Sequence, residues 1–116
     1  PGSAGRGIEF WLLARAVNNL LGNAAKYAAS RIDLSAVRDS AGVRVEVEDD
    51  GPGIPVDARA KVFDPFFRLA RDEDHAAGGY GLGLAIALKA ARLHGGDIAI
   101  DDSPLGGARF TLTLPI

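Results

Sequence analysis

The sequence predicts an α+β domain, a two-layer sandwich in which two helices cover one face of a mixed, mostly antiparallel sheet. Three observations support this prediction. Apolar residues recur at helical spacing in two segments, they alternate with polar residues in two pairs of segments, and clusters of glycine separate these segments. The chain has 116 residues, which is enough for one modest core and too few for two. The expected order of elements is helix, β-hairpin, loop, helix and β-hairpin.

The first helix is expected over residues 9–28. Its apolar side chains fall at the spacing of an amphipathic helix, and they are Phe10, Leu13, Val17, Leu20, Leu21 and Ala24. We expect residues 1–8 to form an N-terminal tail, and we interpret residues 1–3 as a cloning remnant. The domain itself is then expected to comprise residues 9–116.

A β-hairpin is expected after this helix. Apolar and polar residues alternate over residues 31–36 and again over residues 43–48, and the sequence Asp-Ser-Ala-Gly at residues 39–42 supplies a turn between them. Beyond the second strand, residues 55–61 predict a short helix. Regularity is lost over residues 64–80, and because long irregular segments in small domains commonly act as lids, we expect a mobile lid there.

The last third of the chain repeats the pattern of helix and hairpin. Residues 83–93 predict a second amphipathic helix, and the sequence His-Gly-Gly at residues 94–96 is a typical C-terminal stop signal. Apolar residues alternate with polar ones over residues 98–100 and 110–114, with a turn expected at residues 104–107. These segments predict the second hairpin.

The composition excludes several classes of function. The chain contains no cysteine, which excludes disulfides, thiolate metal sites and thiol catalysis. Its formal net charge is -2 and its basic residues are dispersed, so we expect no nucleic-acid partner. No apolar run reaches the roughly 18 residues of a transmembrane helix, so we expect no direct membrane contact from this part of the protein.

A polar stripe follows the first helix. Asn19 and Asn23 are four residues apart and Lys26 follows three residues later, so all three side chains project from one side of the helix. Carboxamide oxygens can bind Mg²⁺, and an ammonium group can bind phosphate. Taken alone, this stretch is equally compatible with a solvated helix face.

An acidic turn follows the end of an apolar strand, where residues 49–53 read Asp-Asp-Gly-Pro-Gly. The carboxylate of Asp49 can accept a hydrogen bond from an exocyclic amine, while Gly51 and Gly53 allow the backbone to approach a flat base. Taken alone, the stretch is more typical of a tight surface turn, which Asp, Gly and Pro favour.

A glycine-rich stretch leads directly into the second helix, where residues 79–84 read Gly-Tyr-Gly-Leu-Gly-Leu. Backbone N–H groups at a helix N-terminus suit phosphate. No parallel β-α-β unit precedes the stretch, so its context excludes a Rossmann-type dinucleotide site.

In their order and spacing, these stretches resemble the nucleotide-binding domain shared by sensor histidine kinases, DNA gyrase, Hsp90 and MutL. Residues 19–26 are similar to the N box, residues 49–53 and 79–83 to the two glycine boxes, and residues 63–67 (Phe-Asp-Pro-Phe-Phe) to the F box. Residues 106–110 resemble the region that closes histidine kinase domains, so the resemblance covers nearly the whole chain. It implies a Bergerat-type ATP-binding fold with a mobile ATP lid.

Within that superfamily, the F box followed by Arg68 resembles the histidine kinases. Gyrase-like ATPases place a glutamate near position 19 to activate water, whereas Asn19 carries an amide that cannot take a proton at neutral pH. A neutral imidazole needs less help as a nucleophile than water does. The resemblance therefore implies an ATP-dependent protein histidine kinase of two-component signal transduction. Its catalytic domain would donate the γ-phosphate of ATP to a histidine on dimerisation helices that this chain lacks.

The resemblance also implies a role for each matching residue. Asn23 would bind Mg²⁺ through its side-chain oxygen, and Asp49 would take the adenine amino group. Catalytic roles would fall to Asn19, Lys26 and Arg68, as an orienting group and two phosphate contacts. The residues that would contact ATP are Asn19, Asn23, Lys26, Tyr27, Asp49, Gly51, Gly53, Ile54, Phe63, Gly79, Tyr80, Gly81, Leu82, Gly83 and Leu84.

The expected partners are ATP, the kinase's own dimerisation and histidine-phosphotransfer helices and, indirectly, a response regulator. The resemblance further implies a cytoplasmic domain of an inner-membrane sensor, which would be monomeric in isolation. Two alternatives stay open. One is an anti-sigma-factor-type serine kinase, which would need a carboxylate base near position 19. The other is a nucleotide-binding interaction module without turnover.

Overall fold

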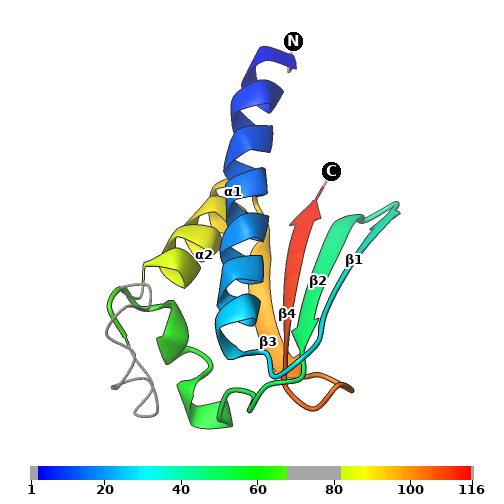
Figure 1. Cartoon of the computed structure of the whole chain (residues 1–116). Coiled ribbons are helices and arrows are strands. Elements are labelled where there is room, and N and C mark those ends of the chain that lie inside the picture. The colour runs from blue at the N-terminus through cyan, green and yellow to red at the C-terminus, as the bar shows by residue number, and fades with distance from the viewer. Residues whose placement is uncertain (1–2, 68–81, 116) are drawn as a thin grey trace.

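The computed structural model describes residues 3–67 and 82–115 (Figure 1). Its elements follow the expected order of helix, hairpin, loop, helix and hairpin. They are α1 (Ser3–Tyr27), β1 (Ile32–Asp39), β2 (Gly42–Asp49), the short 3₁₀ helices η1 (Val56–Ala58) and η2 (Lys61–Phe63), α2 (Gly83–Leu93), β3 (Asp97–Asp102) and β4 (Ala108–Pro115). The α+β prediction is thus confirmed.

The four strands form one sheet in the order β1-β2-β4-β3, and each pair of neighbours is antiparallel. The prediction of a mixed sheet is wrong for the part of the chain that the structure describes. β2 and β3 are each antiparallel to β4, so these two strands run in the same direction. β4 lies between them and pairs with both, and therefore no parallel pair forms.

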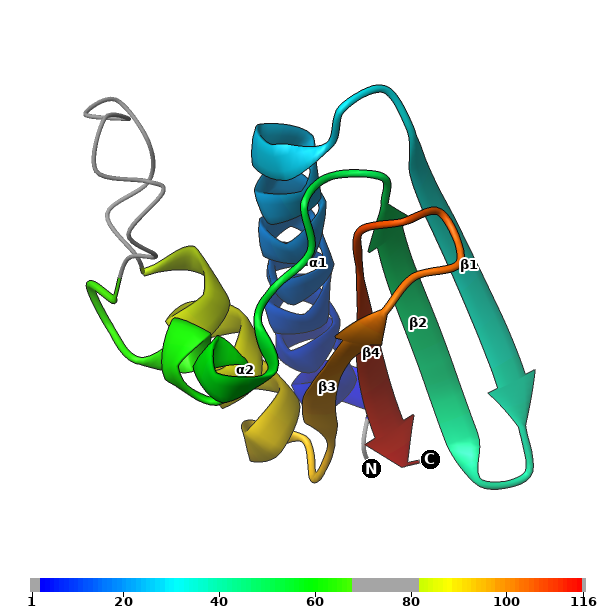
Figure 2. The ribbon, with the colours of Figure 1, turned by 90° about the horizontal axis from the view of Figure 1, so that it is seen from below.

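Both helices lie on the same side of the sheet (Figure 2). Side chains alternate between the two faces of a strand, so Phe110 and Leu112 of β4 are buried beneath the helices while Arg109 and Thr111 lie on the opposite face. The helices contribute Leu20 of α1 and several small residues to the same core; these are Ala16, Ala24, Ala87, Ala90 and Ala91. Small side chains on both helices allow them to pack closely on one another.

α1 begins at Ser3, six residues before the helix start that the sequence predicted at residue 9. Apolar periodicity marks only the part of a helix that packs on a core, and the first turns of α1 project beyond the end of the sheet (Figure 1). Gly5 and Gly7 each cost a helix only about 1 kcal/mol relative to alanine, which is too little to end it. The domain boundary at residue 8 stays a prediction.

The loop after β2 also differs in detail from the prediction. The single short helix expected over residues 55–61 is replaced by η1 and η2, which are separated by a turn. Of the expected lid, residues 64–67 form turns, whereas residues 68–80 lie outside the described residues.

α2 and the second hairpin agree with the prediction. α2 ends where Gly95 adopts a φ of +79° and the N–H of Gly96 donates to the carbonyl of Ala91 at 2.8 Å. Among the described residues, neither helix combines the length and the apolarity needed to span a bilayer.

Candidate functional site

Asp49, the last residue of β2, lies at the centre of the candidate site. Its side chain is buried, and the residue is only 2% exposed. Oδ1 accepts hydrogen bonds from the N–H of Gly51 at 2.8 Å and of Ala108 at 3.4 Å, and the backbone carbonyl accepts from Gly107 at 3.1 Å. A buried carboxylate requires such partners. These N–H groups fix the orientation of the Asp49 carboxylate, and within the described chain none of them donates to Oδ2.

Glycines allow three segments of backbone to meet around this carboxylate. A Cβ at Gly107 would collide with Oδ1 of Asp49, and a Cβ at Gly51 would collide with the carbonyl of Tyr27 at the end of α1. Gly53 has a φ of +74° and lies against Gly107, with 3.7 Å between its ideal Cβ position and the Gly107 carbonyl carbon. The end of α1, the end of β2 and the β3–β4 loop therefore converge at one point.

The neighbouring carboxylate, Asp50, holds the turn that follows α1. Its Oδ1 accepts from the N–H groups of Ala29 at 2.8 Å, Ser30 at 2.9 Å and Arg31 at 3.0 Å. Its Oδ2 accepts from the Ser30 hydroxyl at 2.6 Å and the Ser30 N–H at 3.1 Å. The hydroxyl and N–H of Ser30, followed by the N–H groups of Arg31 and Ala29, hold the pKa of Asp50 well below its usual range.

The polar stripe of α1 leads from this convergence toward α2. Asn19, Asn23 and Tyr27 are spaced by four residues, so they lie along one side of the helix over about 12 Å. At the far end of the stripe, the ideal Cβ position of Gly83 in α2 is 4.0 Å from Cβ and Cγ of Asn19. At the near end, Nζ of Lys26 is 5.3 Å from the ring centroid of Tyr27.

Asn19 carries an orphaned polar atom. Its Nδ2 is buried and has no hydrogen-bond partner among the described residues. Buried donors in native proteins are almost always paired. An acceptor oxygen supplied from outside the described residues, such as that of a ligand, would satisfy this donor.

The N-terminus of α2 faces the same stripe. Leu82 precedes the helix and provides no side-chain cap, and the first turn contains no acidic residue. The N–H groups of that turn have no partner within the helix itself. Together with the dipole of an 11-residue helix, they favour an anionic ligand.

The structure describes four of the remaining predicted contacts. Ile54 is buried in the core, Phe63 packs edge-on against Phe110 with a centroid distance of 6.5 Å, and Leu84 is partly buried against the same core. Leu82 is 39% exposed. The other predicted residues, Arg68, Gly79, Tyr80 and Gly81, lie outside the described residues.

Sequence reasoning missed three residues that build the site. Asp50 and Gly107 were not assigned any contact, although both touch the segments that orient Asp49. Arg59 was also missed: its Nε donates to the carbonyl of Ile54 at 2.9 Å and its guanidinium pairs with Asp102 at 2.7 Å. The paired glycines before β4 were a signal for Gly107, whereas the turn that binds Asp50 and the Asp102 partner of Arg59 lie too far away in sequence to be recognised.

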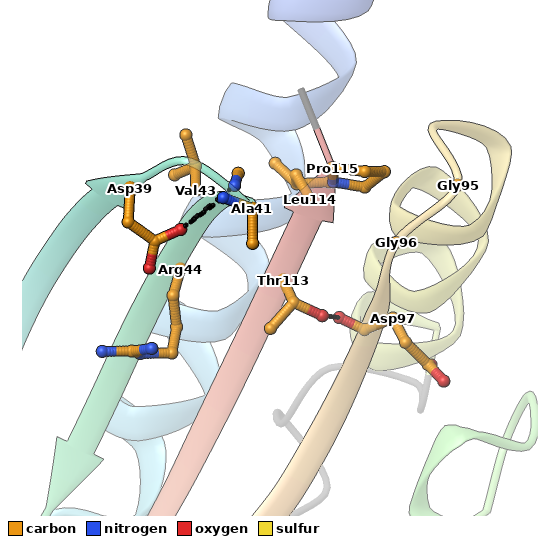
Figure 3. A pocket seen from close by; sticks show the side chains of 11 residues that line it. Asp39, Ala41, Val43, Arg44, Gly95, Gly96, Asp97, Thr113, Leu114 and Pro115 are labelled. Carbon is orange, nitrogen blue, oxygen red and sulfur yellow. Dashed lines mark hydrogen bonds between the residues drawn. The ribbon is translucent and has the colours of Figure 1, made fainter.

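A separate pocket lies at the opposite end of the sheet (Figure 3). It has a volume of about 470 Å³ and is lined by residues of the β1–β2 turn, the α2–β3 connection and the end of β4, among them Arg44, Asp97 and Thr113. An apolar groove of about 440 Å³ runs between η2 and α2 and includes Leu88 and Leu93. Neither of these two pockets is lined by Asp49 or by the asparagines of α1.

Comparison with known proteins shows the family of the chain. The sequence pattern of the family described as histidine kinase-, DNA gyrase B-, and HSP90-like ATPase matches residues 11–116. The sensor protein RstB of Escherichia coli K12 is 41% identical over 109 residues, which cover 94% of this chain and 25% of RstB. The chain thus spans about a quarter of the length of that curated relative.

Solved structures give the same result. The ATP-binding domain of PrrB from Mycobacterium tuberculosis superimposes with a TM-score of 0.68 at 40% identity, covering 86% of this chain and 63% of that one. The mycobacterial sensor histidine kinase MprB superimposes with a TM-score of 0.76 at 35% identity, covering 87% and 70%. The chain therefore belongs to the histidine kinase-, DNA gyrase B- and HSP90-like ATPase family.

Proposed function

We propose that this domain binds Mg-ATP where α1, the end of β2 and the start of α2 meet, and donates the γ-phosphate to a histidine on the dimerisation helices of its parent kinase. One observation carries the proposal. Asp49 is a buried carboxylate whose Oδ1 is held by backbone N–H groups, at the point where the end of α1, the end of β2 and the β3–β4 loop converge.

Asp49 would recognise adenine. A carboxylate with one oxygen fixed by the protein presents its other oxygen in a defined direction, which suits an exocyclic amino group. Gly51 and Gly53 leave the adjoining backbone without side chains, so a flat base can approach it. This assignment gives Asp49 the role that the resemblance implies.

The phosphates would lie along the polar stripe, between Lys26 at its near end and the first turn of α2 at its far end. Lys26 offers a positive charge, Nδ2 of Asn19 offers a buried donor, and the first turn of α2 offers backbone N–H groups. Phosphoryl transfer depends mainly on such positioning and charge neutralisation. Arg68 would add a second cation near the terminal phosphate.

The donor set of α1 fits Mg²⁺ that arrives with a nucleotide. The described residues contain no group of three His, Cys, Asp or Glu side chains that could form an all-protein metal site. Mg²⁺ commonly takes only one or two protein ligands and completes its shell with water and phosphate oxygens. The carboxamide oxygen of Asn23 would be such a ligand, and the ion would neutralise charge on the phosphates.

The acceptor is proposed to be histidine because the polar stripe contains no base. Asn19 and Asn23 cannot take a proton from water or from a hydroxyl group, whereas an unprotonated imidazole is already a nucleophile. The parent protein would be an inner-membrane sensor with this domain on its cytoplasmic side. A response regulator would then receive the phosphoryl group.

The direct test is phosphoryl transfer. The domain is mixed with the dimerisation helices of its parent kinase and radiolabelled ATP, and label on the helices is followed over time. We expect acid-labile label on the helices and none when their histidine is replaced by alanine. Tight ATP binding without any labelling would instead support an interaction module without turnover.

Replacing Asp49 tests adenine recognition. We expect Asp49→Asn to raise the Kd for Mg-ATP by about 10- to 100-fold, the effect of losing a hydrogen bond to a charged group. Isothermal titration calorimetry would measure it. Asp57→Asn removes an exposed carboxylate from η1 and should leave the Kd unchanged. Wild-type affinity in the Asp49 variant would remove this residue from the proposal.

A further inference from the structure

We propose that Asp50, adjacent to the adenine-binding Asp49, is a positioning residue that sets the distance between the adenine-binding and the phosphate-binding groups of the nucleotide site. It would do so by clamping the turn after α1 and thereby fixing Lys26 and Tyr27 relative to Asp49. This inference rests on the proposed function, because it concerns how the same site holds a triphosphate.

The clamp consists of hydrogen bonds from the turn after α1 to the carboxylate of Asp50. Three successive N–H groups, those of residues 29–31, converge on one carboxylate oxygen at 2.8 to 3.0 Å, and the Ser30 hydroxyl binds the other oxygen at 2.6 Å. Successive N–H groups in such a turn form a concave anion-binding site. Here the anion is a side chain of the protein itself, so it ties two segments together that are about 20 residues apart.

The clamp holds the end of α1. The turn begins directly after Tyr27, whose carbonyl lies against Gly51, and Lys26 packs its ammonium group over the Tyr27 ring at 5.3 Å. The backbone adds one further bond between the segments, from the N–H of Asp50 to the carbonyl of Arg31 at 3.2 Å. A shift of this turn would therefore move Lys26 and Tyr27 together, away from Asp49.

The clamp has a consequence for how the site binds ATP. Asp49 and the glycines beside it serve the adenine, whereas Lys26 serves the phosphates. Without the clamp, each half of the site can still bind its own part of the ligand, but the two halves are no longer held at the separation that ATP requires. Loss of Asp50 should therefore weaken ATP binding much more than adenosine binding.

The experiment compares the two ligands. Dissociation constants for Mg-ATP and for adenosine are measured by NMR titration for wild type, Asp50→Ala and Ser30→Ala, at a temperature where each variant is folded by circular dichroism. We expect Asp50→Ala to raise the Kd for Mg-ATP by about tenfold or more and the Kd for adenosine by less than about threefold. Ser30→Ala, which removes one hydrogen bond of the clamp, should show a smaller effect in the same direction.

The matched control is Asp33→Ala. Asp33 is a nearby carboxylate that binds the side chain of Arg31 at 3.0 Å, and within the described chain it makes no bond to the backbone of the turn. Both dissociation constants should stay at their wild-type values. If Asp50→Ala does not fold, the same two dissociation constants are compared for Asp50→Asn and Ser30→Ala, because both variants leave part of the clamp intact.

Each outcome has a distinct meaning. An equal loss for both ligands, or no loss for either, overturns the positioning role while leaving the proposed function in place. Wild-type protein that binds adenosine and ATP with the same affinity would contradict a site in which separate groups bind the adenine and the phosphates. Wild-type protein that binds neither ligand would contradict the proposed function.

Discussion

Individual glycine positions decide how closely the backbone can approach Asp49. Gly107 has no room for a Cβ, because that atom would collide with Oδ1 and the carbonyl oxygen of Asp49 and with the backbone nitrogen of Gly51. Gly22, in contrast, lies on the exposed side of α1 with nothing within 4 Å of its ideal Cβ position. The same residue type therefore has opposite effects at these two positions.

This contrast gives a prediction for stability. Gly107→Ala should lower the free energy of unfolding by about 1–3 kcal/mol, because the new methyl group overpacks a closed site. Gly22→Ala should raise it by about 0.5–1 kcal/mol, since alanine loses less entropy than glycine in a helix. Urea unfolding of both variants measures these changes. A stable Gly107→Ala protein with unaltered nucleotide binding would show that the β3–β4 loop can move away from Asp49.

A second prediction at the residue scale concerns pH. The folded protein lowers the pKa of Asp50, chiefly through the Ser30 hydroxyl. Asp50 therefore contributes stability that is fully present above the ordinary carboxyl pKa of about 3.9 and is lost as pH falls toward the lower pKa of the folded state.

The comparison of wild type with Asp50→Asn tests this sign. The difference in the free energy of unfolding between them should be constant from about pH 7 to pH 5 and should shrink below about pH 4. Ser30→Ala should reduce the part that depends on pH, because it removes the largest cause of the shift. A difference that did not change with pH would contradict the assigned hydrogen bonds.

At the scale of elements, the two helices pack through small side chains. The buried residues of α2 are alanines at positions 87, 90 and 91, and α1 contributes Ala16 and Ala24 to the same core. Close packing keeps the first turn of α2 near Asn19. The position of the phosphate end of the site therefore depends on this interface.

Enlarging the interface should destabilise the protein. Ala87→Leu adds volume at a fully buried position, and we expect it to lower the free energy of unfolding by about 1–3 kcal/mol. Ala85→Leu is the matched control, because Ala85 lines the open groove between η2 and α2, where a larger side chain has space. Thermal unfolding of both variants distinguishes them. Equal stability of the two would mean that the alanine interface is loosely packed.

Most elements could be predicted from sequence, because helices and strands that pack on a core carry apolar residues at the spacing of a helix or of a strand. α2 begins and ends as predicted, and the hairpin turn at residues 39–42 matches the pairing of Asp39 with Gly42. The start of α1 could not be predicted, since its first turns project beyond the end of the sheet (Figure 1). The absence of parallel pairing could not be predicted either, because it follows from the insertion of β4 between β2 and β3.

The site was predictable only where its residues form local motifs. Asp49, Gly51 and the asparagines of α1 stand in short, recognisable stretches. The clamp made by Asp50 joins segments 20 residues apart, and the N–H of Ala108 reaches Asp49 across 59 residues. Such pairings depend on the tertiary fold, and no local spacing indicates them.

At the scale of the whole molecule, the sheet has two chemically different ends. One end holds Asp49, the clamp of Asp50 and the end of α1, whereas the other holds the pocket beside Arg44 and Asp97 (Figure 3). A strand of eight residues such as β2 separates these ends by about 25 Å. A ligand bound at one end would therefore leave the other end largely undisturbed.

The most direct measurement is an NMR titration of backbone amides with Mg²⁺ and a non-hydrolysable ATP analogue. We expect the largest shifts at Asn23, Gly51 and Ala108, with little change at Gly42 and Gly96. Shifts concentrated at Gly42 and Gly96, with Asn23 and Gly51 unperturbed, would place the nucleotide in the opposite pocket and contradict a nucleotide site at Asp49.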